Sequence, residues 1–164
     1  MRLLGNHPRQ SVLSIALMCL LGDQWLKHLL RNTLPVGNSI PLIASILHIT
    51  HVQNTGTAFS LFSQYPLLVL IMGSLLLMVL GGYVAVRKQM AVLEVIAYGF
   101  IMGGALGNLW DRFTQGSVTD YIDVRWIHYP VFNLADSLIF FGIGLIIWHS
   151  LRLPPTEPPK NNCS

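Results

Sequence analysis

Acidic side chains are concentrated in one stretch of this sequence. Four of the seven acidic residues lie between Gly103 and Ser137, and these are Asp111, Asp120, Asp123 and Asp136. Two carboxyl groups held close together cannot both ionise, so one keeps a proton while the other acts as a base on water. Such a pair can hydrolyse a peptide bond without a metal ion or a covalent intermediate, because it can also protonate the leaving amine.

The residues alone leave open which two aspartates form such a pair. Asp136 is the strongest single candidate, because it lies near the start of a long apolar segment, where burying a carboxylate is costly. We expect its partner to come from the polar crossover that precedes this segment. Asp111 lies beside Arg112 at a predicted helix end, and Asp123 lies near Arg125 in a predicted loop. Structural ion pairs, or a structural role for all four aspartates, therefore remain open.

Other catalytic chemistries have less support. Cys19 lies among apolar neighbours, and Met18 before it is too large for the small residue that usually precedes a lipid-attachment cysteine. Cys163 lies in the polar tail, so we do not expect a disulfide. Lys27 lies four residues after Asp23 and is expected to pair with it, so it is not expected to activate a serine. The chain has no HExxH or CxxC pattern, and no metal ion or other cofactor is predicted.

The six histidines are scattered along the chain. His48 and His51 lie close together, but in an extended segment they would point to opposite faces, so we do not expect them to share a metal ion. We expect the histidines to be polar surface residues.

Composition indicates a membrane protein. Hydrophobic residues make up 52% of the 164 residues and charged residues only 10%, against roughly 25% charged residues in soluble domains. The mean hydropathy is +0.55. The net charge of +3 does not indicate nucleic-acid binding, because lysines and arginines are scattered and form no basic stripe.

The sequence predicts an all-α membrane protein with four transmembrane helices. The first apolar segment follows Arg2 and Arg9 as in a secretory signal peptide, but Gly22 leads directly into Asp23, where a cleavage site would need small residues. We therefore retain it as a helix. The predicted helices span residues 11–30, 66–86, about 91–110 and about 132–153.

Two spacings within these helices predict contacts. Gly99, Gly103 and Gly107 recur every four residues, which predicts a face that another helix can approach closely. Asp23 precedes Lys27 by four residues, which is the favourable order for an ion pair along a helix. We expect this pair to have a structural role.

Two segments are predicted to lie outside the bundle. Residues 32–65 contain no Lys, Arg, Asp or Glu, and their β-branched run at 46–52 predicts a small sheet-like flap on the membrane surface. Asn54 alone would fit a turn residue. Residues 113–131 are too polar to span, and we expect an amphipathic or irregular crossover there. Residues 1–153 are expected to form one domain, followed by a disordered cytoplasmic tail at 154–164.

The basic residues predict the orientation of the bundle. Six of the ten lysines and arginines lie on the side that carries both chain ends and the only short connection, so we expect this side to be cytoplasmic. The aspartates then lie at the outer face, together with three tryptophans that fit an aromatic belt, Trp25, Trp110 and Trp126.

Five motifs, in this order, resemble those of the lipoprotein signal peptidases, also called signal peptidase II. They are DQWLK at 23–27, NTGTAFS at 54–60, GNLWDR at 107–112, VTDYID at 118–123 and FNLADS at 132–137. The resemblance extends from the first predicted helix to the fourth. It implies a bacterial inner-membrane aspartyl endopeptidase that removes the signal peptide of a prolipoprotein by cutting before a cysteine that carries diacylglycerol.

The resemblance also implies roles for individual residues. The catalytic pair would be Asp120 and Asp136. Positions that line the substrate pocket match Asn54, Gly56, Asn108, Arg112 and Asn133, while structural support would come from Asp23, Lys27 and Asp111. The implied fold has four transmembrane helices, a small periplasmic β-cradle and a periplasmic helix, with the active site at the periplasmic face. Globomycin-type peptides inhibit this family, and no cofactor is implied.

Two functions of other classes are alternatives. A small membrane transporter or proton-relay subunit would distribute its acidic residues along a path through the bilayer, whereas here they gather at one face. A noncatalytic binding or assembly protein would keep its function after Asp120→Asn or Asp136→Asn.

Overall fold

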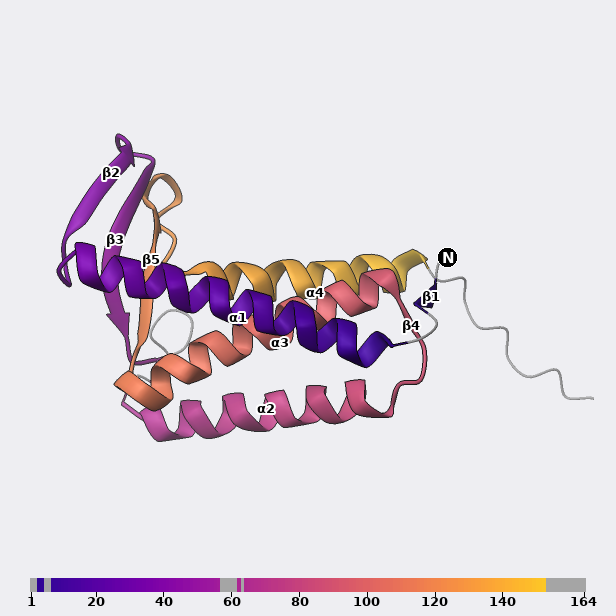
Figure 1. Cartoon of the computed structure of the whole chain (residues 1–164). Coiled ribbons are helices and arrows are strands. Elements are labelled where there is room, and N and C mark those ends of the chain that lie inside the picture. Colours follow the sequence, from indigo (N-terminus) through magenta and orange to yellow (C-terminus); the bar gives the residue numbers. More distant parts are fainter. Residues whose placement is uncertain (1–2, 5–6, 57–61, 63, 153–164) are drawn as a thin grey trace, which may run out of the picture.

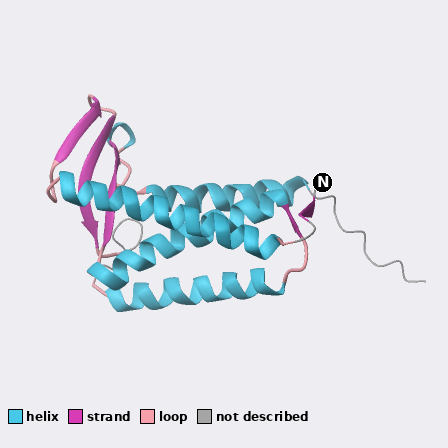
Figure 2. Ribbon diagram, in the orientation of Figure 1, coloured by secondary structure: helices cyan, strands magenta, loops and turns pink. Residues whose placement is uncertain are grey.

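The computed structural model describes residues 3–4, 7–56, 62 and 64–152. Within them, four long helices form a bundle, and a small antiparallel sheet lies across one end of it (Figure 1). The helices are α1 (Pro8–Thr33), α2 (Pro66–Val86), α3 (Val92–Gln115) and α4 (Leu134–Arg152). A mostly helical chain with a small sheet is therefore confirmed (Figure 2). Residues 57–60 of the NTGTAFS motif and the predicted tail lie outside the described residues.

Three of the described helices, α2, α3 and α4, are long and apolar enough to cross a membrane. Their most apolar windows have mean hydropathies of 2.5, 1.5 and 1.7. Helix α1 is long enough but carries Asp23 and Lys27 in its interior. Composition thus does not confirm the predicted fourth span.

Helix α3 is the centre of the bundle and packs against each of the other three helices. Its glycines allow close contact with α1, because a Cβ atom on Gly99 would lie 2.5 Å from Ile15, and one on Gly103 would lie 2.5 Å from Cys19. A Cβ atom on Gly107 would collide with the Asp23 carboxylate. The predicted small-residue face is confirmed, and it brings α1 against the end of α3 that carries Asn108 and Asp111.

The sheet contains β2 (Ser39–Ile43), β3 (Leu47–Asn54) and β5 (Val118–Val124), in the order β2-β3-β5. The predicted strand at 46–52 is confirmed. The predicted amphipathic or irregular crossover at 113–131 is wrong, because its β-branched and aromatic residues form β5 against β3. Helix α3 is followed by its C-cap Gly116, whose φ of 72° lies in the left-handed region. The short 3-10 helix η2 (Arg125–Ile127) follows β5.

The two faces of β5 have different neighbours. Asp120 lies opposite Val52 of β3, and because side chains alternate along a strand, Asp120 shares its face with Ile122. On the other face, Tyr121 packs with Leu30 of α1. One face of β5 thus packs against α1, and the opposite face carries Asp120.

The bundle is tied together at the end away from the sheet by a short pairing of β1 (Leu3–Leu4) with β4 (Met90–Ala91), which the sequence did not predict. Both the start of α1 and the end of α4 lie at this end (Figure 1).

The prediction that the histidines lie on the surface is wrong for His48, His51 and His149, which are all buried. His48 and His51 belong to β3, the central strand of the sheet. His51 Nδ1 lies 2.6 Å from the carbonyl oxygen of Leu34. These side chains therefore pack inside the protein.

Candidate active site

Asp120 and Asp136 are brought together by a single residue, Asn133. Its side-chain Nδ2 donates to Asp120 Oδ1 over 2.7 Å, and its backbone N–H donates to Asp136 Oδ2 over 3.2 Å. One carboxyl group comes from β5 and the other from the first turn of α4. Because Asn133 donates a hydrogen bond to each of them, the two carboxyl groups lie close together.

The local sequence explains how α4 begins here. Phe132 forms an isolated bridge with Ile122, which returns the chain to β5 directly before Asn133. Asn133 Oδ1 then accepts the backbone N–H of Asp136 over 3.0 Å, while the Asp136 carboxylate accepts the backbone N–H of Asn133. These reciprocal bonds form a capping box, which starts the helix and fixes the Asp136 side chain.

Two further asparagines complete the contacts of the pair. Asn54 Nδ2 donates to Asp120 Oδ2 over 3.1 Å, and Asn108 Nδ2 donates to Asp136 Oδ1 over 2.7 Å. Asn54 is also the turn residue that its sequence context suggested, because its Oδ1 accepts the N–H of Gly56 over 2.9 Å. The structure therefore confirms Asn54 as a turn residue and places its side chain against Asp120, while its role in substrate binding stays a prediction.

Arg112 connects the end of α3 to the turn after β3. Its Nη2 donates to the Gly56 carbonyl over 2.7 Å, and its Nη1 lies 3.4 Å from the Asn108 carbonyl. The expected pairing of Arg112 with Asp111 is wrong, since consecutive residues on a helix do not face each other. The guanidinium instead faces the site.

A cavity of about 140 Å³ lies among these groups. The charged and amide side chains that line it are Asn54, Asn108, Arg112, Asp120 and Asp136. An apolar groove of about 530 Å³ adjoins it and is lined by Ile122, Val124, Ile127, Ser137, Phe140 and Phe141. Cavity and groove share Tyr129, Phe132 and Asp136. The cavity that both aspartates line thus adjoins a larger apolar groove.

Asp120 has the electrostatic properties of an acid–base group. Burial raises the pKa of its carboxyl group to about 7, and the negative charge of Asp136 adds to this increase. Hydrogen bonds from Asn54 and Asn133 act in the opposite direction without cancelling it. Near neutral pH, Asp120 can therefore both hold and release a proton.

This raised pKa predicts a pH-dependent effect of Asp120→Asn on stability. The folded protein binds the Asp120 proton more tightly than the unfolded chain, whose pKa is near 3.8, so wild-type stability falls as pH rises from about 4 to about 7. Asparagine does not titrate, so the variant lacks this loss. Its free energy of unfolding relative to wild type should therefore increase by up to about 4 kcal/mol between pH 4 and pH 8. Thermal unfolding of both proteins in detergent at the two pH values measures it. An equal difference in unfolding temperature at both pH values would contradict the raised pKa.

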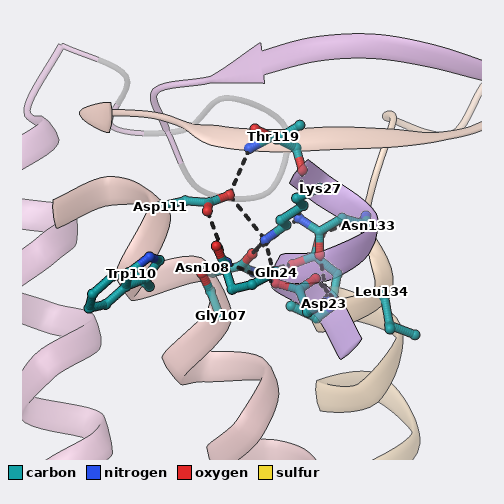
Figure 3. A network of polar contacts seen from close by, with 12 residues as sticks. Asp23, Gln24, Lys27, Gly107, Asn108, Trp110, Asp111, Thr119, Asn133 and Leu134 are labelled. Carbon is teal, nitrogen blue, oxygen red and sulfur yellow. Dashed lines mark hydrogen bonds and ion pairs between the residues drawn. The ribbon is translucent and has the colours of Figure 1, made fainter. Parts of the chain in front are cut away.

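A second polar cluster, which we call the buried triad, consists of Asp23, Lys27 and Asp111 (Figure 3). Lys27 Nζ lies 2.8 Å from Asp23 Oδ2 and 3.1 Å from Asp111 Oδ2, and all three side chains are 0% exposed. The predicted pairing of Asp23 with Lys27 is confirmed. Asp111 pairs with Lys27 and, at 3.5 Å, with Arg31.

The sequence prediction missed two residues of this network. Gln24 Nε2 donates to Asp111 Oδ1 over 3.0 Å and to the Gly107 carbonyl over 3.1 Å. The backbone N–H of Thr119 donates to Asp111 Oδ2 over 3.1 Å. Gln24 lies in the DQWLK motif and Thr119 in the VTDYID motif, and this position within a motif is the feature of the sequence that could have indicated them.

Asp123 belongs neither to the cavity nor to the buried triad. Its carboxylate accepts hydrogen bonds from Thr50 over 2.6 Å and from Arg125 over 2.9 Å. The expected contact with Arg125 exists, although Asp123 belongs to a strand and not to a loop.

Comparison with known proteins assigns this arrangement to a family. The model of signal peptidase (SPase) II matches residues 15–152. The chain belongs to the signal peptidase II family. A lipoprotein signal peptidase of Nostoc sp. is 40% identical over 82% of this chain and 85% of its own, and one of Brevibacillus brevis is 33% identical over 81% and 89%.

Solved structures agree with this assignment. A bacterial membrane enzyme determined by the in meso method at 2.3 Å resolution has a TM-score of 0.82 and 29% identity, covering 92% of this chain and 93% of its own. A second, at 1.9 Å resolution, has a TM-score of 0.78 and 31% identity over 88% and 95%. This signal peptidase II is thus a membrane-embedded bacterial hydrolase of the aspartic type.

Proposed function

We propose that Asp120 and Asp136 are the two catalytic groups of this peptidase. As a signal peptidase II, the chain removes the signal peptide from prolipoproteins. The observation that carries the assignment is the bridging of both carboxyl groups by Asn133, at a cavity that opens into an apolar groove. The raised pKa of Asp120 supports a shared proton at neutral pH.

In this mechanism, one carboxylate removes a proton from a water molecule, which attacks the carbonyl carbon of the scissile bond. The other carboxyl group donates its proton to the carbonyl oxygen. The tetrahedral intermediate then collapses, a proton passes to the leaving nitrogen and the C–N bond breaks. The products are a carboxylic acid and an amine, and the pair again holds one proton.

Arg112 and Asn54 are proposed to hold the substrate backbone. The Nε atom of Arg112 is buried and has no hydrogen-bond partner among the described residues, although the side chain lines the cavity. A buried donor without a partner costs free energy, which a substrate carbonyl would recover by accepting its hydrogen bond. Gly56 positions the adjoining turn, because its carbonyl already accepts from Arg112.

We place the site at the periplasmic face of the inner membrane, with both termini in the cytoplasm. At the end of the bundle that carries the site, three exposed tryptophans fit a membrane interface: Trp25, Trp110 and Trp126. Helix α1 would be the fourth span, since its interior charges are satisfied inside the protein by Asp111 and Asn108 and never face lipid.

The apolar groove is proposed to hold the acyl chains of the substrate's diacylglyceryl group. It is lined almost entirely by apolar side chains and shares Asp136 with the cavity, so a lipid attached next to the scissile bond would enter it directly. Globomycin-type peptides would occupy the same cavity and groove. A gel-shift cleavage assay with a diacylglyceryl-modified prolipoprotein and its unlipidated counterpart tests the function, since cleavage of both alike would exclude lipid recognition.

Phe140→Ser should weaken binding of the lipidated substrate. Phe140 lines the groove, and losing its apolar surface should raise KM roughly tenfold while leaving kcat unchanged. Leu151→Ser is the matched control, because Leu151 is an exposed apolar residue near the other end of α4. Steady-state cleavage of the lipidated substrate measures both variants. An equal change of KM in the two variants would show that the groove does not bind the substrate.

A further inference from the structure

We infer that the buried triad sets the spacing of the two catalytic aspartates, with Lys27 as the positioning residue that links them. The inference rests on the proposed catalytic pair and adds the polar contacts that hold the two aspartates in position. Each carboxylate of the triad accepts the backbone N–H of the residue directly before one of the catalytic aspartates. Lys27 joins the two carboxylates (Figure 3).

The first of these contacts reaches β5. Asp111 Oδ2 accepts the backbone N–H of Thr119 over 3.1 Å, and Thr119 directly precedes Asp120. Arg31 Nη1 lies 3.2 Å from the Thr119 hydroxyl and 3.5 Å from Asp111, which reinforces the same contact. Asp111 therefore fixes where β5 lies beside α3.

The second of these contacts reaches α4. Asp23 Oδ1 accepts the backbone N–H of Ala135 over 3.1 Å, and Ala135 directly precedes Asp136. This N–H lies in the first turn of a helix, where backbone donors lack an intrahelical acceptor, so a carboxylate there is doubly favourable. Asp23 therefore fixes where α4 starts beside α1.

Lys27 connects Asp23 with Asp111 and also contacts Asn108, which binds the catalytic residue Asp136. Besides Asp23 and Asp111, its ammonium group donates to Asn108 Oδ1 over 3.0 Å, so each of its three N–H bonds has an acceptor. Because Oδ1 of Asn108 faces Lys27, the Nδ2 group of the same amide faces Asp136, to which it donates over 2.7 Å. Lys27 thus orients a direct partner of the catalytic carboxylate.

Stability alone does not account for such a cluster. Well-packed apolar residues often replace a buried ionic group without loss of stability, so its use is better sought in the geometry that it imposes. Here that geometry joins α1, α3, α4 and β5 through groups that are 0% exposed. A displacement of about 1 Å at a catalytic group can cost about 100-fold in rate, which makes precise spacing functionally important.

Lys27→Met tests the inference. We expect kcat to fall at least about 100-fold with KM changed less than about threefold, because the catalytic pair shifts while the groove and Arg112 remain. The alkaline limb of the pH profile should also move to higher pH. The charges facing Asp120 are those of Asp136, Arg112 and Lys27, and removing the positive charge of Lys27 raises the Asp120 pKa.

Glu94→Gln is the matched control. It breaks the ion pair with Arg87, at 3.2 Å, at the end of the bundle away from the site. It should lower the unfolding temperature but leave kcat and the pH profile unchanged. If Lys27→Met does not fold, the double variant Asp23→Asn/Lys27→Met removes one charge of each sign and leaves Asp111 paired with Arg31. The same loss of kcat and shift of the limb are expected for it.

Several outcomes would overturn the inference. A folded variant with wild-type kcat, or with activity that falls only with the folded fraction and with unmoved pH limbs, would reduce the triad to a structural role. Failure of the proposed function gives a different pattern, in which Asp120→Asn or Asp136→Asn keeps its activity. If both aspartate variants are inactive and Lys27→Met is unaffected, only the role of the triad is wrong.

Discussion

Asp136→Asn and Asp120→Asn should each reduce kcat by about 10³-fold or more while the protein stays folded. The proposed reaction needs one carboxyl group as base and the other as acid, and an amide can do neither at neutral pH. Each substitution removes one of the two hydrogen bonds that the carboxylate accepts, but the protein should still fold, because asparagine is close in size to aspartate and keeps one oxygen acceptor. Cleavage of a diacylglyceryl-modified prolipoprotein, followed by gel shift in detergent or nanodiscs, measures the loss.

Asp123→Asn provides the control for these variants. Asp123 lies on the same strand as Asp120 but bonds to Thr50 and Arg125 and does not line the cavity. It should keep near wild-type kcat. Retention of more than about a tenth of wild-type activity by Asp120→Asn or Asp136→Asn would refute the assignment of the pair, and binding of a globomycin-type peptide by the inactive variants would confirm that they are folded.

Sequence physics located the acidic groups but could not pair them. Asp136 stood out because of its position at the start of an apolar helix, whereas the choice of Asp120 came from the family resemblance. In the structure, pairing with β3 positions the strand β5 that carries Asp120, and the bridge from Ile122 to Phe132 brings the start of α4, which carries Asp136, next to it. These are contacts between distant segments, and local periodicity contains no information about their register.

The same limit explains the errors at Asp111 and in the crossover. The segment after α3 was expected to be irregular because it is too polar to span, but a strand needs only one apolar face and a partner, which β3 provides. The sequence suggests an ion pair between Asp111 and Arg112, its neighbour in sequence. Asp111 instead pairs with Lys27 and Arg31, which both belong to α1, and the close packing of α1 on α3 brings these groups together. The glycine spacing was the one visible sign of that packing.

Gly103→Val should destabilise the protein by at least about 3 kcal/mol and remove most of its activity. Even a Cβ atom at Gly103 would lie 2.5 Å from Cys19 Cβ and 2.7 Å from the Ala16 carbonyl oxygen, and both belong to α1. The contact includes backbone, so no side-chain rotation can relieve it and the helices must separate. Separation moves Lys27 away from Asp111 and Asn108, which couples the fold to the site.

Gly82→Val separates this effect from the general cost of valine in a helix. Gly82 belongs to α2 and a Cβ atom there would meet nothing within 4 Å, so this variant should unfold at nearly the wild-type temperature and cleave at the wild-type rate. Thermal unfolding and cleavage assays on both variants in the same detergent make the comparison. If Gly103→Val matched Gly82→Val in both measurements, close approach of α1 to α3 would not be what brings Lys27 to Asp111, and the site would have to be held by the sheet and α4 alone.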